Sequence, residues 1–454
     1  MNAITAPRMG FGLGSRLSFM MFLQYAIWGA WLPLLLSYML DVLKFSPGQI
    51  GYIFMAGGVG AIFGPFIAGQ VADRWFSTEK YLGIVHIIGG LLIWQLSWIS
   101  EYWMFFGFSI LYSLLYSPTL ALTNSLAFHH IPDRDRDFGW VRCWGTIGWI
   151  VVGVGIGQWL LHMHTPVEGD IELAQSMGIK DAFRLSAVLG VIMGVYCFSL
   201  PKTPPQKGKA EFAVAEAAKE CSRQPLLMLF LIAVPISMIH QFYFVYTADF
   251  LSEIQRESAQ AKSTTAEINK VFGVGGGGIM TIGQMSEFFV IFLIPFFAAK
   301  VSRKFLLAVG IFAYALRMFL FSQMSWIQET LGIPDIVIII AGVSLHGVCF
   351  GSFIFVAFLV VDEETSVDIK ASAQNLFNLV IVGIGIVVGS IVAGHVGDWA
   401  MVPAMADGVQ VVKDGEPQTK IDYAFLYGVP MYAALGCLAI LLAFYPRSTR
   451  HVAG

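Results

Sequence analysis

The stretch "PKTPPQKGKAEFAVAEAAKECSRQ", residues 201–224, is the most polar segment of a chain that otherwise consists of long apolar runs. Charged and proline-rich segments are unfavourable in hydrocarbon, so this one is expected to connect membrane helices. Six apolar runs precede it and six follow it. We therefore predict an N-terminal six-helix half at 1–200, a cytoplasmic linker at 201–224 and a C-terminal six-helix half at 225–454.

The apolar runs are continuous, and each reaches the roughly 20 residues that a membrane-spanning helix requires. Continuous runs favour helices, because the strands of a membrane barrel alternate between apolar and polar residues. The predicted fold class is an all-α integral membrane protein with 12 transmembrane helices. Their approximate limits are 17–40, 49–72, 81–99, 103–128, 140–161, 182–200, 225–250, 276–299, 304–325, 334–360, 371–397 and 423–445.

The composition agrees with this class. Of 454 residues, 57% are hydrophobic and only 13% are charged, whereas soluble domains carry about 25% charged residues. A net charge of −3 and the lack of a Lys/Arg stripe argue against nucleic-acid binding. The five cysteines form no CxxC pair, so neither a disulfide framework nor a metal site is expected.

Lys and Arg gather in the loops on the N-terminal side of the membrane, which predicts a multi-pass protein with both termini cytoplasmic. The segments 162–181, 251–275 and 404–422 are then outer loops.

The loop after the second span, "GQVADRWFSTEK" at 69–80, carries a more specific signal. Gly69, Asp73 and Arg74 fit the G-x-x-x-D-R/K core of a loop motif found in major facilitator transporters. An aspartate at a helix end can pair with basic groups and hold one conformation of a rocking bundle. Together with six spans on each side of a polar linker, the motif favours the major facilitator fold.

Polar groups within spans are functional candidates because they are costly in lipid. In "TIGQMSEFFVIFLIPFF", residues 281–297, Gln284 and Glu287 are three residues apart on neighbouring parts of one helix face. A central carboxylate costs about 2.5–3.5 kcal/mol on insertion scales, so it is expected to face a watery interior, where it binds a polar substrate or takes up a proton. The alternative is a structural hydrogen bond between helices.

Arg142 and Thr146 in "VRCWGTIGW" are four residues apart, and Trp149 follows three residues later. This spacing puts a cation, a hydroxyl and an indole ring along one helix face. An Arg fork beside an aromatic ring suits planar heterocycles or sugars that carry hydroxyls. The alternative is that Arg142 extends to the membrane interface.

The seventh and tenth spans hold a second group of candidates. Gln241 and His240 can form hydrogen bonds, while His346 can titrate near neutral pH and is followed one turn later by Phe350. A histidine paired between helices is a competing interpretation. The remaining intramembrane polar residues are interpreted as helix-packing contacts: Arg317, Gln24, Asn124, Gln374, Asn375 and Asn378.

Two other motifs are set aside. "GVGGGG" at 273–278 follows no strand and lacks a GK[ST] sequence, so phosphate binding is not expected, and a flexible entry to the eighth span is predicted instead. "HHIPDRDRD" at 129–137 resembles a metal cluster only in composition, and it is interpreted as a solvated cytoplasmic turn.

Five stretches, with the span order, resemble the bacterial nucleoside:proton symporters of the major facilitator superfamily. They are "LQYAIWGAWLPLLLSYM" (23–39), "RCWGTIGW" (142–149), "IMTIGQMSEFFVIFLIPFF" (279–297), "ALRMFLF" (315–321) and "KASAQNLF" (370–377). The resemblance implies nucleoside uptake driven by the proton gradient, through a central cavity with alternating access. It also implies a bacterial cytoplasmic membrane protein that functions as a monomer without a cofactor, with the proton as coupling ion.

The resemblance implies substrate-binding groups at Arg142, Thr146, Gln241, Gln284, Glu287 and Phe350, with an aromatic residue at Trp149. His346 joins this predicted substrate-binding set because it lies one turn before Phe350 and can titrate. Three positions depart from the family pattern. Phe244 stands where an Asn is expected, His346 where a Tyr is expected, and Gly351 where an acid is expected. Because one intramembrane carboxylate is missing, Glu287 is the first candidate for proton coupling and His346 the second.

Other functions remain open at this point. A carrier for sugars, nucleobases or another small metabolite would use similar groups, and an uncoupled nucleoside facilitator would explain Gly351. An intramembrane enzyme is not expected, because the spans hold no paired acids, Ser/His pair or His-rich metal cluster. A receptor that keeps the fold without transporting is the last alternative.

Overall fold

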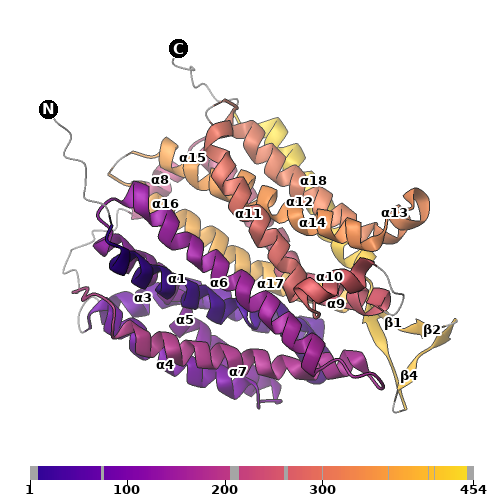
Figure 1. The fold of residues 1–454 in the computed structure, drawn as a ribbon. Helices are drawn as coiled ribbons and strands as arrows, with labels where there is room; N and C mark the ends of the chain where they lie inside the picture. Colours follow the sequence, from indigo (N-terminus) through magenta and orange to yellow (C-terminus); the bar gives the residue numbers. More distant parts are fainter. Residues whose placement is uncertain are drawn as a thin grey trace. The chain divides into compact units, whose positions relative to one another are not determined.

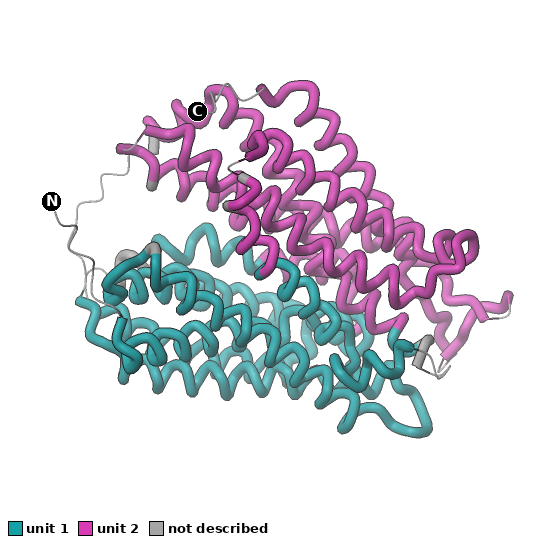
Figure 2. Tube along the Cα trace, turned by 45° about the horizontal axis from the view of Figure 1, so that its top comes forward, with its two compact units in different colours: residues 1–43, 56–211, 255–288 teal, residues 44–55, 212–254, 289–454 magenta. Residues whose placement is uncertain are grey.

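The computed structural model describes residues 9–72, 76–204, 214–259, 264–298, 300–366, 368–406, 408–413 and 415–446. Figure 2 shows two compact units. Unit 1 comprises residues 1–43, 56–211 and 255–288, and unit 2 comprises residues 44–55, 212–254 and 289–454. Each unit contains residues from before and after the linker 201–224. The predicted division into an N-terminal and a C-terminal six-helix half therefore stays a prediction.

The described residues are mostly helical (Figure 1). Unit 1 contains α1 (Phe11–Gly29), η1 (Leu32–Leu34), α2 (Leu35–Ser37), η2 (Tyr38–Val42), α4 (Thr78–Leu96), α5 (Tyr102–His130), α6 (Arg134–Met163), α7 (Ile171–Cys197) and α10 (Thr264–Phe272). Unit 2 contains α8 (Val214–Cys221), α12 (Arg303–Ser322), α13 (Met324–Leu331), α14 (Asp335–Cys349), η3 (Phe350–Phe355), α15 (Val356–Glu364), α16 (Lys370–Asn378), η4 (Leu379–Gly385), α17 (Ile386–Trp399) and α18 (Tyr423–Phe444). Residues of α3 (Pro47–Ala72), α9 (Leu226–Ala259) and α11 (Gly277–Ala298) belong to both units.

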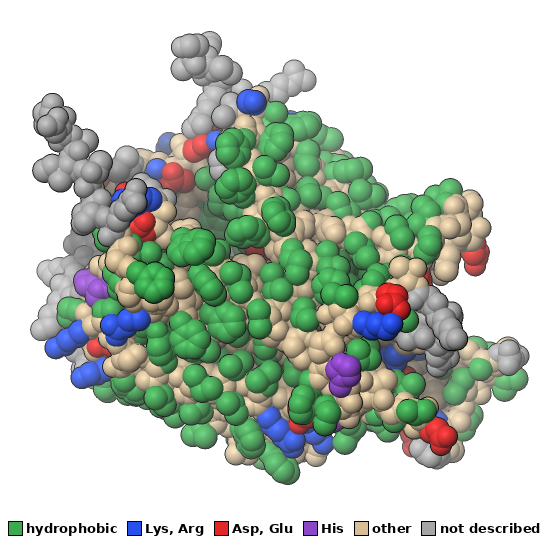
Figure 3. Space-filling view, in the orientation of Figure 1, with side chains coloured by type: hydrophobic (Ala, Val, Ile, Leu, Met, Phe, Trp, Pro, Cys, Tyr) green, Lys and Arg blue, Asp and Glu red, His purple; other side chains and the backbone are tan. Residues whose placement is uncertain are grey.

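The predicted helical membrane protein is confirmed. Ten helices among the described residues are long and apolar enough to span a bilayer, and the other two predicted spans, 81–99 and 182–200, coincide with most of α4 and α7. On the face drawn in Figure 3, hydrophobic side chains predominate and charged ones gather toward the margins. Exposed apolar residues such as Phe66, Phe292 and Phe444 suit contact with lipid.

Helices of unit 1 approach one another closely where glycines face a neighbour. At the crossing of α1 and α6, a Cβ on Gly148 would lie only 2.2 Å from the carbonyl oxygen of Phe22. Helices α4 and α7 run side by side in Figure 1, and a Cβ on Gly194 would lie 2.7 Å from the carbonyl oxygen of Gly83. Small residues at such contacts stabilise membrane helix pairs, because they let backbones and side chains pack without voids.

We expect Gly148→Ala to lower the melting temperature of the detergent-solubilised protein. The added methyl group must push α1 and α6 apart, and overpacking of this kind costs about 1–3 kcal/mol. Gly155 on the same helix has open space at its Cβ position, so Gly155→Ala is the matched control and should leave the melting temperature unchanged or raise it. Equal melting temperatures for the two variants would contradict the close helix contact.

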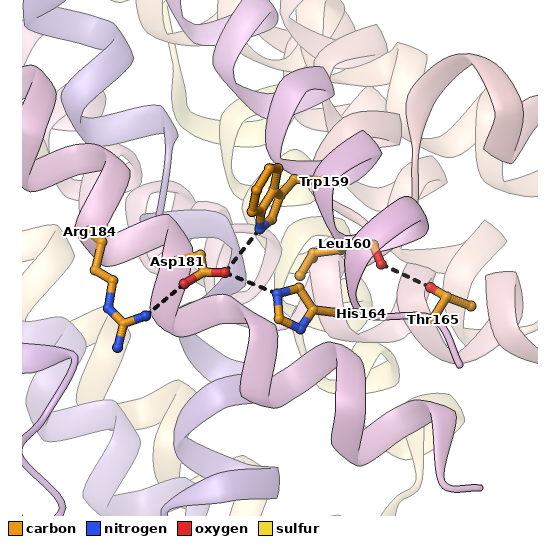
Figure 4. Close-up of polar contacts among 6 residues, drawn as sticks. All are labelled: Trp159, Leu160, His164, Thr165, Asp181 and Arg184. Atoms are coloured by element: carbon orange, nitrogen blue, oxygen red, sulfur yellow. Dashed lines mark hydrogen bonds and ion pairs between the residues drawn. The ribbon is translucent and has the colours of Figure 1, made fainter. Parts of the chain in front are cut away.

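A polar cluster joins the C-terminal end of α6 to α7 (Figure 4). Asp181 accepts hydrogen bonds from Trp159 Nε1 at 3.0 Å, from His164 Nε2 at 3.0 Å and from Arg184 at 2.9 Å. Thr165 adds a hydrogen bond to the carbonyl oxygen of Leu160 at 2.9 Å. The cluster fixes the turn between the two helices, which the sequence interpretation treated as an irregular outer loop.

The predicted outer loops are more structured than expected. Helix α7 begins at Ile171, inside the predicted loop 162–181, and α9 and α10 occupy most of 251–275. The loop 404–422 carries short antiparallel strands, which pair as β1 (Met401–Pro403) with β6 (Thr419–Ile421), β2 (Met405–Ala406) with β3 (Val409–Gln410), and β4 (Val412–Lys413) with β5 (Glu416–Pro417). Apart from these strands, the described elements are helical.

The glycine-rich segment before α11 is closely packed, so the predicted flexible entry is not what the structure has. Gly273, Gly275 and Gly276 have positive φ angles of 75°, 83° and 76°, which only glycine adopts without strain. A Cβ on Gly273 would lie 1.9 Å from the backbone of Gly157, and Val274 N–H donates to the Gly157 carbonyl at 3.0 Å. The segment thus positions the start of α11 against α6.

Of the predicted loop motif, Gly69 lies in α3, while Asp73 and Arg74 lie outside the described residues.

Candidate functional site

In unit 1, Arg142 lies about two turns into α6 and its guanidinium stacks on an aromatic ring of α1. The Arg142 Cζ atom is 4.2 Å from the ring centroid of Tyr25. Gly145 makes this stack possible, because a Cβ there would lie 2.6 Å from the Tyr25 ring and 2.9 Å from Arg142 Nη1. Both side chains are half-buried. A stacked, planar guanidinium keeps its N–H groups in one orientation, so the site is preorganised for a polar ligand.

Two tryptophans continue this surface along the same pair of helices. Trp149 of α6 packs edge to face on Trp28 of α1, with ring centroids 5.7 Å apart and planes at 85°. The backbone of Gly29 allows this contact, because a Cβ there would lie 2.9 Å from the Trp149 ring. Trp149 is only 8% exposed, so it supports the site more than it borders it. Thr146, between Arg142 and Trp149, is half-buried.

Glu287 and Gln284 lie on α11 and belong to unit 1 together with Arg142. Both are half-buried, although α11 is otherwise strongly apolar. A carboxylate and an amide are costly within an apolar span, so both are functional candidates. Unit 1 therefore combines a stacked cation, a carboxylate and an amide, the groups that bind the edges and hydroxyls of a polar heterocycle.

The buried amide of Gln24 on α1 serves helix packing, in line with its interpretation from the sequence. It is fully buried, donates to Thr119 at 2.8 Å and is 3.0 Å from His86 Nε2. Tyr116 donates to the backbone carbonyl of Gln24, and its ring lies 6.2 Å from that of Trp28, tilted by 54°. These bonds tie α1 to α4 and α5, so the helix that carries Tyr25 is held firmly.

In unit 2, Gln241 of α9 is 6% exposed and donates to the hydroxyl of Ser390 on α17 at 3.0 Å. Gly389 gives it room, since a Cβ there would lie 3.0 Å from Gln241 Cγ. The carbonyl oxygen of the Gln241 amide retains its capacity as an acceptor. In this conformation Gln241 is therefore chiefly a helix-to-helix contact.

His240, His346 and Phe350 lie together with two tyrosines. His346 is 1% exposed and stacks on Tyr243 at 4.9 Å and on His240 at 5.4 Å between ring centroids. Phe350 is half-buried at the start of the π-helical turn η3, with its ring 6.5 Å from His346. Tyr314 O–H lies 2.8 Å from His240 Nδ1. π-Helical turns frequently occur at functional sites.

Gly351 follows Phe350 in this turn, at the position where the family resemblance implies an acid. A Cβ at Gly351 would lie 2.7 Å from Cγ1 of Val290. Val290 therefore fills the space that a side chain at 351 would need. The position is adapted to glycine and is not a vacant acid site.

The structure brings the sequence candidates together in two groups. Arg142, Thr146, Trp149, Gln284 and Glu287 belong to unit 1, whereas Gln241, His346 and Phe350 belong to unit 2. The sequence interpretation missed Tyr25 and Trp28, which lie in the quoted stretch 23–39. Their spacing of three residues on α1 is a signal that could have suggested a shared helix face.

We expect Tyr25→Leu to weaken uridine binding about tenfold, because a cation over an aromatic ring in a desolvated site contributes about 1–2 kcal/mol. Tyr25→Phe keeps the ring and should bind almost as well as the wild type. Competition of unlabelled uridine against labelled uridine measures both affinities. If Tyr25→Phe lost as much affinity as Tyr25→Leu, the hydroxyl and not the stack would matter.

Comparison with known proteins adds independent information. The sequence profile described as "Nucleoside H+ symporter" matches residues 11–450. The putative nucleoside transporter YegT of Escherichia coli (strain K12) is 31% identical over 386 residues, which cover 83% of this chain and 82% of that protein. The nucleoside permease NupG of the same organism is 27% identical over 393 residues, covering 84% and 87% of the two chains.

A crystal structure of a mutant of the nucleoside transporter NupG superimposes with a TM-score of 0.79. It is 25% identical and covers 96% of this chain and all of its own. The match extends over almost the full set of helices, and it confirms the fold expected from the loop motif and span order. The chain therefore has the fold of major facilitator transporters and belongs to the nucleoside H+ symporter family.

Proposed function

We propose that this protein imports nucleosides by proton symport with alternating access. The observation that carries the proposal is the Arg142–Tyr25 stack in unit 1, the unit that also holds the half-buried Glu287. Arg142 and Gln284 bind ribose hydroxyls and base edges, and Glu287 both accepts hydrogen bonds from the substrate and carries the coupling proton. Thr146 and Trp149 complete the unit 1 group. Unit 2 holds a second group of proposed substrate-binding residues: Gln241, His346 and Phe350.

The chemistry of these groups suits a nucleoside. A guanidinium and an amide offer several donors to carbonyl and ring-nitrogen acceptors, and a carboxylate accepts from the paired hydroxyls of a ribose. Two of the relatives are named as nucleoside transporters, one of them putatively, and these names agree with the proposed substrate class. We propose further that the protein works as a monomer in a bacterial cytoplasmic membrane, with both termini cytoplasmic and without a cofactor.

An uncoupled nucleoside facilitator is the second candidate, and Gly351 favours it. The resemblance implies an acid at this position, but Val290 occupies the space beside it. Under this alternative, Glu287 binds substrate only and nucleosides move down their own gradient.

Uptake of labelled uridine and adenosine into proteoliposomes tests the proposal. With an imposed inward proton gradient, the wild type should accumulate both nucleosides, and a protonophore should abolish accumulation. A competition panel of free nucleobases, ribose and other sugars should leave uptake intact. Inhibition by sugars but not by nucleosides would overturn the substrate class. Uptake that stops at equal concentrations on the two sides and does not respond to the protonophore would favour the facilitator.

A further inference from the structure

Arg317 of α12 is a cation that the proposed function does not use. Its side chain is fully buried, and two of its nitrogens, Nε and Nη2, have no hydrogen-bond partner among the described residues. The guanidinium lies over two aromatic rings, with Cζ 4.1 Å from the centroid of Tyr243 and 5.1 Å from that of Tyr314. Burying a charge without a paired acid is expensive, and stacking on two rings offsets only part of that expense. Stability alone therefore does not explain the burial of Arg317.

The remaining contact of Arg317 is to a histidine of the candidate site. Arg317 Nη1 is 3.2 Å from His346 Nδ1. A guanidinium carries only donors and stays protonated in proteins. The Nδ1 atom must therefore be the acceptor, with its lone pair directed at Arg317. A histidine with an unprotonated Nδ1 is neutral and carries its single proton on Nε2.

We propose that Arg317 is a positioning residue that fixes His346 as the neutral Nε2–H tautomer. This inference rests on the proposed function, because it concerns which residue of that site carries the coupling proton. Held in this state, His346 is a hydrogen-bond donor through Nε2, suited to a carbonyl oxygen or an unprotonated ring nitrogen of a nucleobase. It does not carry a proton through the transport cycle, and coupling depends on Glu287 alone.

The surroundings of His346 agree with this role. Helix α9 contributes His240 and Tyr243, both stacked on the imidazole, and α12 contributes Arg317 and Tyr314. These groups are a cation, a second histidine and two phenols. Helix α18 adds Tyr427, whose phenol interacts with the charge of Arg317. The contacts described for His346 are to the cation Arg317 and to aromatic rings.

The first test reads the tautomer directly in the wild-type protein. Nitrogen-15 NMR of histidine-labelled protein in bilayers distinguishes protonated from unprotonated ring nitrogens, and the sequence holds only nine histidines. The signals of His346 are those lost in His346→Gln. We expect an unprotonated Nδ1 and a protonated Nε2 throughout the range around pH ~6.5 in which free imidazole titrates. A proton on Nδ1, or titration within this range, would overturn the proposal.

The second test uses the pH dependence of uridine uptake in four proteins: wild type, Arg317→Gln, His346→Gln and the double variant. Wild type and His346→Gln should have profiles of the same shape, because His346 does not titrate. Arg317→Gln removes the positive charge beside His346 and offers an amide oxygen that can accept from Nδ1–H. Its profile should therefore gain an inflection that the double variant lacks. Because His240 stacks on His346, the same four proteins are also compared in a His240→Gln background, where His240 cannot produce the difference. Arg317→Lys still donates to Nδ1 and should restore the wild-type shape.

Two outcomes of uptake would contradict the inference: different profile shapes for wild type and His346→Gln, or identical shapes for Arg317→Gln and the double variant. If the wild-type protein transported no nucleosides, the proposed function itself would be wrong. The NMR measurement needs neither transport nor a variant at position 317. It therefore decides the tautomer even if the protein transports no nucleosides or if Arg317→Gln fails to fold.

Discussion

Glu287→Gln is expected to lower uridine uptake about ten- to a hundredfold and to make the remaining uptake independent of the imposed proton gradient. The substitution keeps the size and polarity of the side chain but removes its charge and its capacity to bind a coupling proton. Hydrogen bonds to a charged group contribute about 1.5–3 kcal/mol, which corresponds to this loss of apparent affinity. Uptake with and without a protonophore measures both effects.

The matched control is Glu329→Gln, which removes a carboxylate from an exposed position on α13. It should transport like the wild type. If Glu287→Gln retained both the affinity and the response to the protonophore, Glu287 would have no part in the site.

Arg142→Gln is expected to have the larger effect of the two, with uridine uptake reduced about a hundredfold or more. It removes the cation that stacks on Tyr25 and the donors proposed to bind the substrate. Hydrogen bonds from a charged donor contribute about 1.5–3 kcal/mol each, so losing two of them corresponds to a loss of this size. Initial rates of uptake at several uridine concentrations give the change in apparent affinity and in maximal rate.

Two further variants separate charge from shape. Arg142→Lys keeps the charge but loses the planar stack, so it should recover only part of the uptake. In Arg142→Gln/Glu287→Gln the losses of the single variants should not add, because both residues are proposed to bind the same substrate. Additive losses would show that the two residues act independently and would contradict a shared site.

The helical membrane class followed from the sequence because hydrocarbon permits few alternatives. A chain segment in lipid must satisfy its backbone hydrogen bonds internally, so continuous apolar runs become helices. The outer segments are less constrained, since water satisfies their backbone. There the structure departs from expectation: α7 begins at Ile171, and short strands pair Met401 with Ile421. The Asp181 cluster is one cause, because its hydrogen bonds join α6 to α7 across the predicted outer loop 162–181.

Within the candidate site, helix periodicity located residues but not their partners. The spacing of Arg142 and Thr146 indicated a shared face, yet nothing in the spacing indicated that Tyr25, on another helix, lies under the guanidinium. The same holds for Arg317, which was interpreted as a packing residue until its bond to His346 identified a specific neighbour. Polar residues in spans can be recognised from composition, whereas the helix that each one faces depends on how the bundle packs.

The most direct test of proton symport is the movement of protons that uridine itself causes. Proteoliposomes with a pH-sensitive dye in the lumen, and no imposed gradient, are mixed with uridine. The lumen is expected to become more acidic in the wild type and in His346→Gln, but not in Glu287→Gln. Entry of labelled uridine into wild-type vesicles with no change in lumenal pH would contradict it.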